Sequence, residues 1–175
     1  QNLSILLSFG SFIFCCFNHN FKILPDMFEI WMKILKKVKN SVIWLLIDNK
    51  TAQNNLKKIL VSNDIDPNRM IFAGRLPHSE HIIRLGLADL FLDTFPCNAH
   101  TTASDALRSS LPIITIKGNS FASRVASSLL SSVGLEELIT KSGKEYEELA
   151  VKIAENKNFY KEIKNNTNQN AIMFE

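Results

Sequence analysis

The stretch DLFLDTFPCNAHTTASDAL, residues 89–107, decides the fold of this chain. It begins with an apolar run that predicts a short buried strand, and it ends with a helical pattern that starts near residue 100. A Pro, a Cys, an Asn, a His and two Thr residues lie between the two elements. Junctions between a strand and a helix are the places where α/β proteins hold phosphate groups. The stretch therefore raises the question of whether this chain binds a phosphate group, and which kind of ligand carries that phosphate.

The same alternation of strand and helix patterns recurs along the whole chain. Short apolar runs, rich in β-branched and aromatic residues, predict strands within residues 12–17, 41–47, 66–74, 89–93 and 111–116. Longer amphipathic runs predict helices within residues 25–38, 51–64, 77–87, 100–110, 120–134 and 144–165. This order predicts an α/β fold, a Rossmann-like parallel sheet with helices on both faces.

Local signals predict where several of these helices begin and end. Pro25 suits the first turn of a helix, Thr51 is a candidate N-cap, and Gly134 is a candidate helix stop. The last helical run is interrupted near residues 156–158. We expect one folded unit over residues 11–165, followed by a loose polar tail over residues 166–175.

Composition limits the classes of partner. The chain has 175 residues, 46% of them hydrophobic, which is enough for one domain with a core. Its net charge of +3 is small and its basic residues are dispersed, which argues against a nucleic-acid partner. The apolar run in the first 17 residues is interrupted by Gly10 and is too short to span a membrane. Three cysteines without the paired spacing of a zinc site suggest a reducing, cytoplasmic compartment, and the first residue, Gln1, suggests a fragment of a longer protein.

The loops that follow the strands carry the candidate site, because ligands of such folds bind at the carboxyl ends of the strands. Thr101 and Thr102 add hydroxyl groups to a helix N-terminus that favours an anion. Asp105, one turn further, would reach sugar hydroxyls rather than phosphate. The alternative is that Thr101 only caps the helix and that Asp105 is a solvent-exposed residue.

Two other loops contain charged candidates. Lys22, after the first strand, would neutralise a leaving diphosphate, although an ordinary surface lysine is the alternative. His78, His81 and Arg84 lie within two helical turns, and His81 and Arg84 share a face. His78 and His81 resemble a pair of metal ligands, but no convincing third ligand lies nearby. No glycine-rich phosphate loop of either standard type occurs.

Four segments together resemble a known family. They are FNHNFKI (17–23), NSVIWLL (40–46), LPHSEHIIRLGLADLFLDTFPCNAHTTASDAL (76–107) and FASRVASSLL (121–130). In this order they resemble the catalytic region of the O-linked N-acetylglucosamine transferases, glycosyltransferase family 41, and most of all its bacterial members. The resemblance implies a GT-B glycosyltransferase fold, of which residues 11–165 would form the C-terminal, donor-binding lobe.

The resemblance also implies roles for individual residues. The predicted catalytic residue is Lys22, which would hold the diphosphate and help UDP to leave. The predicted donor-binding residues are His19, Leu76, His78, His81, Arg84, His100, Thr101, Thr102 and Asp105. Of these, His100 and the two threonines would contact the phosphates, Asp105 the ribose, and the backbone near Leu76 the uracil edge. The chain departs from the family at His78, where the animal enzymes have a lysine, at His19, where they have a glutamine, and at Ala99, which replaces a glycine.

The function that the resemblance implies is transfer of N-acetylglucosamine from UDP-N-acetylglucosamine to Ser or Thr residues of a protein, with no metal or other cofactor. The histidine before the two threonines and the FASRV segment, which the GDP-fucose branch of the family tends to lack, favour this donor; the alternative is a family member that uses GDP-fucose or UDP-glucose. The N-terminal catalytic lobe and the tetratricopeptide repeats of the family are absent from these 175 residues. We therefore expect an incomplete enzyme that needs an N-terminal lobe and a protein acceptor. The alternatives are a non-catalytic nucleotide-binding or interaction module, and another GT-B enzyme such as a sugar-nucleotide epimerase.

Overall fold

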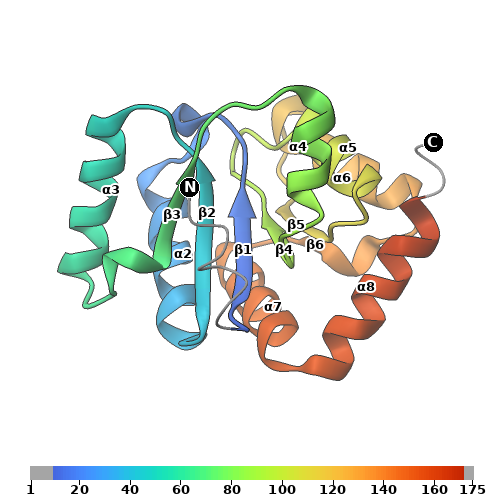
Figure 1. Cartoon of the computed structure of the whole chain (residues 1–175). Coiled ribbons are helices and arrows are strands. Elements are labelled where there is room, and N and C mark those ends of the chain that lie inside the picture. The colour runs from blue at the N-terminus through green and yellow to red at the C-terminus, as the bar shows by residue number, and fades with distance from the viewer. Residues whose placement is uncertain (1–9, 172–175) are drawn as a thin grey trace.

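A computed structural model describes residues 10–171 and places six strands in one parallel sheet (Figure 1). The strands are β1 (Phe12–Cys16), β2 (Ser41–Leu46), β3 (Met70–Ala73), β4 (Leu90–Leu92), β5 (Ile113–Ile116) and β6 (Ile139–Thr140). Their order across the sheet is β3-β2-β1-β4-β5-β6. The chain thus builds outward from β1 to β3 and then crosses back to place β4 on the other side of β1. That reversal makes the carboxyl ends of β1 and β4 the topological switch point.

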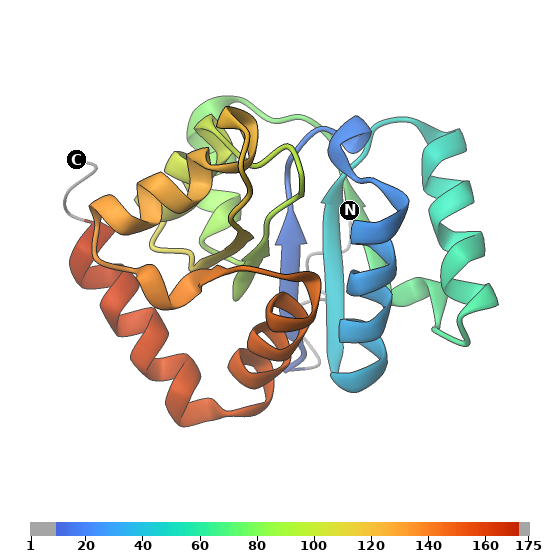
Figure 2. The same ribbon diagram turned by 180° about the vertical axis from the view of Figure 1, so that it is seen from behind.

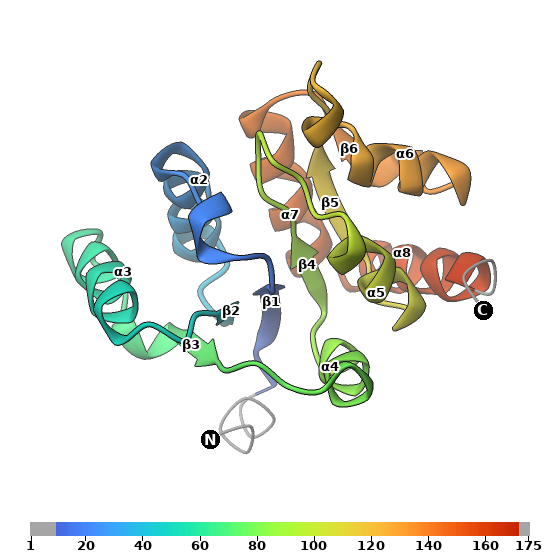
Figure 3. The ribbon, with the colours of Figure 1, turned by 90° about the horizontal axis from the view of Figure 1, so that it is seen from above.

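Helices cover both faces of the sheet, as the strand–helix alternation predicts. They are α2 (Pro25–Lys37), α3 (Lys50–Ser62), α4 (His78–Leu85), α5 (Thr101–Arg108), α6 (Val125–Ser132), α7 (Gly143–Glu155) and α8 (Lys157–Ala171). Four short 3-10 turns connect them: η1 (Asn20–Lys22), η2 (Pro67–Arg69), η3 (Phe121–Ser123) and η4 (Glu136–Leu138). Viewed down onto the carboxyl ends of the strands, α2, α3 and α7 lie on one face, and α4, α5 and α6 on the other (Figure 3). From behind, α2 and α7 lie side by side over the sheet (Figure 2).

Burial of apolar side chains holds these layers together. Trp31, Met32 and Leu35 of α2 and Phe14 of β1 are at most 1% exposed, and they belong to one core that runs through the sheet. Each such side chain contributes roughly 1.5–3 kcal/mol relative to exposure in water. Pro25 lies in the first turn of α2, and Gly134, with a φ of +68°, follows α6, so both of these sequence predictions are confirmed.

Three expectations need correction. The sixth strand, β6, was not predicted, because two residues are too short for a periodic signal. The N-cap of α3 is Asn49 rather than Thr51, since the Asn49 side chain accepts hydrogen bonds from the amides of Thr51 and Ala52. The expected loose tail is wrong for residues 166–171, which form the last turns of α8 with Thr167 fully buried, whereas residues 172–175 lie outside the described part. The predicted interruption is present, since α7 ends at Glu155 and α8 begins at Lys157. No helix within residues 10–171 is long and apolar enough to cross a membrane.

Candidate functional site

The switch point is organised by a buried carboxylate directly after β4. Asp93 is 1% exposed, and its two oxygens accept hydrogen bonds from the Thr115 hydroxyl (2.7 Å), the Ala99 amide (2.6 Å), the Thr94 amide (2.8 Å) and the Asn18 side chain (3.2 Å). Burial raises its pKa to about 6, although these four donors favour the ionised form. Asp93 is therefore a charged anchor at neutral pH, and it fixes the loop that leads into α5. Sequence reasoning missed this role; a carboxylate that ends an apolar strand run was the available signal.

Lys22 lies against that loop, on the short turn η1 that follows β1. Its Nζ atom donates a hydrogen bond of 2.9 Å to the backbone carbonyl of Asn98. Asn98 is fully buried, and its side chain donates to the carbonyl of Thr94, so the carbonyl that receives the lysine is held in place. Asn98 lies two residues before His100, the N-cap of α5. The structure therefore brings Lys22 next to the start of α5, although 76 residues separate Lys22 from Asn98 in the sequence.

The N-terminus of α5 carries unsatisfied donors. The backbone amides of Thr101 and Thr102 have no acceptor among residues 10–171, and no side chain caps the helix. Thr101 is exposed and Thr102 half-buried. The Nε2 atom of His100 is buried without a hydrogen-bond partner in the described chain, and its ring meets the edge of Phe121 with centroids 6.0 Å apart. Free amides, hydroxyls and the positive end of the helix dipole together favour an anion here.

Asp105 and His78 meet across the gap between α5 and α4. The Nε2 atom of His78 is 3.0 Å from Oδ1 of Asp105. Asp105 is 7% exposed, so it is not the solvent-exposed residue that was the alternative reading, whereas His78 is exposed. The pair places an imidazole and a carboxylate one helical turn from the free amides of α5.

Arg84 points into the protein rather than into the site. It is 6% exposed, its guanidinium lies 4.5 Å from the centroid of the Phe17 ring, and it donates hydrogen bonds to the Gly74 carbonyl (2.7 Å) and to Nδ1 of His81 (2.7 Å). The predicted shared face of His81 and Arg84 is confirmed by this contact. Nε of Arg84 is buried without a partner in the described chain, and the role of Arg84 toward a nucleotide stays a prediction.

The loop after β3 completes the site with one residue that sequence reasoning missed. Leu76 is 43% exposed, and neither its N–H nor its C=O has a partner in the described chain, so its backbone is available to a ligand. Arg75 lies beside it, 3.3 Å from Nδ1 of His19 and 3.5 Å from Asp48. The His19 ring stacks on Phe21 at 5.3 Å. A basic residue in a loop at the carboxyl end of a strand was the signal for Arg75.

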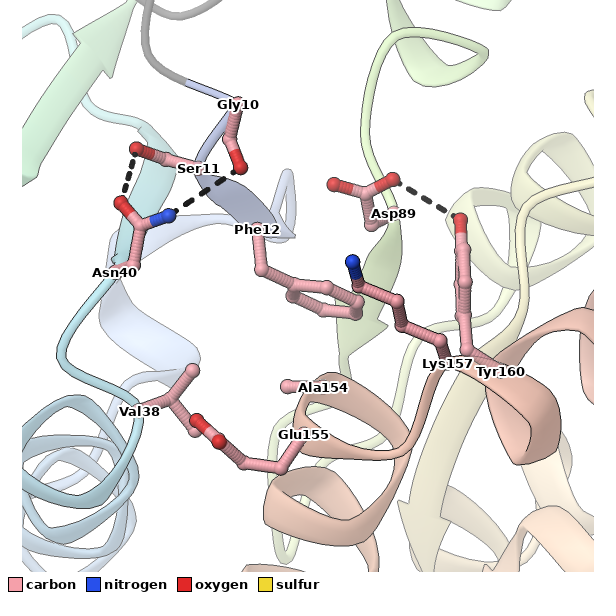
Figure 4. Close-up of a pocket in the computed structure, with 10 residues that line it drawn as sticks. All are labelled: Gly10, Ser11, Phe12, Val38, Asn40, Asp89, Ala154, Glu155, Lys157 and Tyr160. Carbon is pink, nitrogen blue, oxygen red and sulfur yellow. Dashed lines mark hydrogen bonds between the residues drawn. The ribbon is translucent and has the colours of Figure 1, made fainter.

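A cavity lies at the other end of the strands, away from the candidate site (Figure 4). It has a volume of about 500 Å³ and lies where β1 and β4 begin, between Phe12, Lys157 and Tyr160. Asp89 lines this cavity, and both of its carboxylate oxygens accept hydrogen bonds, one from the Ile13 amide and one from the Tyr160 hydroxyl. Asp89 therefore connects α8 to the sheet through Tyr160. The candidate site is the one at the carboxyl ends of the strands. No cluster of three potential metal ligands occurs in the described part of the chain.

Comparison with known proteins identifies the family of this chain. The model of glycosyl transferase family 41 matches residues 6–173. The chain belongs to glycosyl transferase family 41. A Caenorhabditis elegans relative named UDP-N-acetylglucosamine–peptide N-acetylglucosaminyltransferase is 40% identical over 141 residues, which are 81% of this chain and 12% of that protein. An Arabidopsis thaliana relative named "Probable UDP-N-acetylglucosamine–peptide N-acetylglucosaminyltransferase SEC" is 42% identical over 147 residues, 83% of this chain and 15% of that protein.

Solved structures of glycosyltransferases share the fold. An O-GlcNAc transferase of Thermobaculum terrenum, solved as a mutant, superposes with a TM-score of 0.89 at 24% identity, over 94% of this chain and 32% of that one. This likeness confirms the expected α/β fold of a GT-B lobe. The chain thus spans about an eighth of the two curated relatives and a third of the solved glycosyltransferase.

Proposed function

We propose that this chain is the donor-binding lobe of a protein O-glycosyltransferase that transfers N-acetylglucosamine from UDP-N-acetylglucosamine to Ser or Thr residues of proteins. One observation carries the proposal: the Lys22 ammonium binds the carbonyl of Asn98, two residues before the N-cap of α5, so that the cation and the uncapped helix N-terminus converge at the switch point. A diphosphate needs such a pairing of a cation with free backbone amides. The names of the family 41 relatives supply the sugar and the acceptor class.

The residues of the site suit the parts of a uridine nucleotide. Lys22, His100, Thr101 and Thr102 would hold the diphosphate, and the exposed backbone of Leu76 would pair with the uracil edge. Asp105, which His78 contacts, would accept a hydrogen bond from a ribose hydroxyl. His19 and Arg75 lie next to the Lys22 turn, where they would face the phosphates or the sugar.

In the transfer step, an acceptor hydroxyl oxygen bonds to the anomeric carbon as the bond from that carbon to the β-phosphate oxygen breaks. The electron pair of the broken bond leaves with UDP, and the configuration of the sugar inverts. The hydroxyl proton passes to a base, which we assign to the N-terminal lobe of the intact enzyme. Negative charge grows on the β-phosphate as the bond breaks, so the contacts of Lys22 and the α5 amides strengthen in the transition state. These groups supply the charge stabilisation without a metal ion.

Calorimetric titration of the 175-residue chain with UDP, and with GDP in parallel, tests the proposal. We expect UDP to bind and GDP to bind at least about 10-fold more weakly, because a guanine does not match the edge offered at Leu76. Lys22→Ala and Thr101→Ala should each lower UDP affinity about 10-fold or more, since each removes a hydrogen bond to a charged group. Lys33→Ala is the matched control, because that lysine pairs with Glu29 on the surface of α2. Equal affinity for both nucleotides, or affinity unchanged by Lys22→Ala, would contradict the proposal.

A further inference from the structure

Asn18 connects the turn after β1 to the loop after β4. It lies two residues after β1 and four residues before Lys22, and it is 2% exposed. Its Nδ2 atom donates one hydrogen bond to Oδ1 of Asp93 (3.2 Å) and one to the hydroxyl oxygen of Thr94 (2.8 Å). Asp93 and Thr94 begin the loop that leads from β4 to α5. Asn18 therefore joins the turn that bears Lys22 to the loop that leads to the α5 amides.

The chemistry of the two partners determines how the Asn18 amide is oriented. The ionised carboxylate of Asp93 can only accept hydrogen bonds. The Thr94 hydroxyl donates its single proton to the backbone carbonyl of Cys97 (2.7 Å), so its oxygen can only accept from Asn18. Both N–H groups of the amide are thereby used. Neither a carboxylate nor an apolar side chain at position 18 could make these two bonds.

The other end of the amide indicates that burial alone does not explain an asparagine here. The Oδ1 atom of Asn18 is buried and has no hydrogen-bond partner within residues 10–171. A buried acceptor without a donor destabilises the folded state, and an apolar side chain of similar size would avoid that cost. The feature that distinguishes asparagine from such a side chain is its pair of N–H groups, which reach the next loop.

The contact of Lys22 with Asn98 is the outer end of the same connection. Nδ2 of Asn98 donates a hydrogen bond of 2.9 Å to the backbone carbonyl of Thr94, the residue whose hydroxyl Asn18 binds. The backbone carbonyl of Asn98 in turn accepts the Lys22 ammonium at 2.9 Å. The base of the turn, at Asn18, and its tip, at Lys22, are thus held against one hydrogen-bonded loop.

We propose that Asn18 is a positioning residue that sets the place of the Lys22 ammonium relative to the N-terminus of α5, so that both groups meet one diphosphate. Asn18 is buried and acts through Lys22, without touching the ligand. Hydrogen bonds and charge–charge attraction depend on distance, so a shift of the turn weakens binding while every ligand-binding group is still present. This inference rests on the proposed function for the identity of the ligand, whereas the placement of Lys22 is a property of the ligand-free chain.

Competitive acetylation of the ligand-free chain by trace acetic anhydride, followed by peptide mass spectrometry, measures the placement of Lys22. Asn18→Leu roughly keeps the side-chain volume and removes both hydrogen bonds. We expect it to raise the labelling rate of Lys22 about 3-fold or more relative to that of Lys33, because the Lys22 ammonium is then held by the loop less often. Thr140→Val is the matched control, since it removes one buried hydroxyl bond at β6 and should leave the ratio unchanged. An unchanged ratio in a folded Asn18→Leu chain overturns the inference.

A double-mutant cycle on UDP affinity tests the role of Asn18 toward the ligand. In calorimetric titration, Asn18→Leu should weaken UDP binding about 5-fold in the wild-type background, because residues of one hydrogen-bonded network are coupled. In the Lys22→Ala background the same substitution should change UDP affinity by less than about 2-fold, since the group through which it acts is gone. A loss of equal size in both backgrounds would indicate a general structural effect and overturns the positioning role.

Thr94 provides a second pair of variants should Asn18→Leu fail to fold. Thr94→Val removes the acceptor of one Asn18 bond and should raise the Lys22 labelling ratio and weaken UDP binding, whereas Thr94→Ser keeps the hydroxyl and should match the wild type. A folded Thr94→Val chain with the wild-type labelling ratio overturns the inference. Failure of the wild type to bind UDP overturns the proposed function and the ligand assigned here, while the labelling ratios still decide whether Asn18 places Lys22.

Discussion

Replacing Asp93 by asparagine or by alanine separates the charge of this buried carboxylate from its hydrogen bonds. In the folded protein its pKa is raised from 3.8 to about 6, because burial opposes ionisation more than the four donors favour it. One pKa unit corresponds to about 1.4 kcal/mol, so the ionised Asp93 costs the folded state about 3 kcal/mol at neutral pH relative to the unfolded chain. Between pH 4 and 6 the folded chain binds more protons than the unfolded chain. The contribution of Asp93 to stability therefore falls as pH rises through this window.

The two substitutions should then differ sharply. Asp93→Asn keeps an acceptor for the Thr94 and Ala99 amides, and the Thr115 hydroxyl can rotate to accept from the new amide group. We expect its free energy of unfolding at pH 7 to lie within about 1.5 kcal/mol of the wild type, because weaker hydrogen bonds are offset by the loss of a buried charge. Asp93→Ala leaves the Thr94 and Ala99 amides and the Thr115 hydroxyl without this acceptor, while the Asn18 amide keeps only its bond to the Thr94 hydroxyl, and it should destabilise the chain by about 4 kcal/mol or more.

Urea unfolding followed by circular dichroism from pH 4 to pH 7.5 measures both effects. Every other group titrates alike in the wild type and in Asp93→Asn. The difference between their free energies of unfolding, wild type minus Asp93→Asn, therefore isolates the titration of Asp93. We expect this difference to decrease by about 2.4 kcal/mol between pH 4 and pH 7, because the unfolded carboxyl is already partly ionised at pH 4. A difference that is constant within about 1 kcal/mol, or that increases with pH, would refute the reasoning. Equal stability of the alanine and asparagine variants would show that the four hydrogen bonds do not matter.

Two further pairs of substitutions test local packing and helix capping. Gly118→Ala should destabilise the chain by about 1–3 kcal/mol in urea unfolding, because the new methyl group would collide with the Ser123 side chain, whereas Gly74→Ala, which has no neighbour within 4 Å, should change stability by less than about 0.5 kcal/mol. Asn49→Ala should cost about 1 kcal/mol through loss of the α3 cap, and Thr51→Ala clearly less; the reverse order in thermal unfolding would restore Thr51 as the cap.

Several parts of the site followed from the sequence, because they depend on position along the chain. The rule that ligands bind at the carboxyl ends of strands selects the loops that hold Lys22 and Thr101, and the structure places these loops side by side. The three-residue spacing of His81 and Arg84 predicts their contact on α4. The roles of these residues toward a nucleotide remain predictions.

Other parts of the site could not be predicted from spacing. The orientation of a long side chain such as Arg84 depends on its neighbours from other elements, which here are Phe17 and the Gly74 carbonyl. The polar composition of residues 166–171 predicted a loose tail, but these residues form the end of α8. There Thr167 is buried and donates a hydrogen bond to the Ile163 carbonyl of its own helix. A helix that packs against the domain does not need a strongly apolar sequence over its whole length.

By itself, the sequence determined the α/β class, five of the six strands and the edge of the sheet at which polar residues gather. Periodicity is a local property, and it is set by the geometry of strands and helices. The tertiary structure alone decided that Asp93 anchors the loop before α5, that His78 pairs with Asp105, and that Arg84 faces inward. These contacts join residues 6 to 27 positions apart on different elements or loops, and the free energy of burying a charged group depends on which partners the fold brings to it.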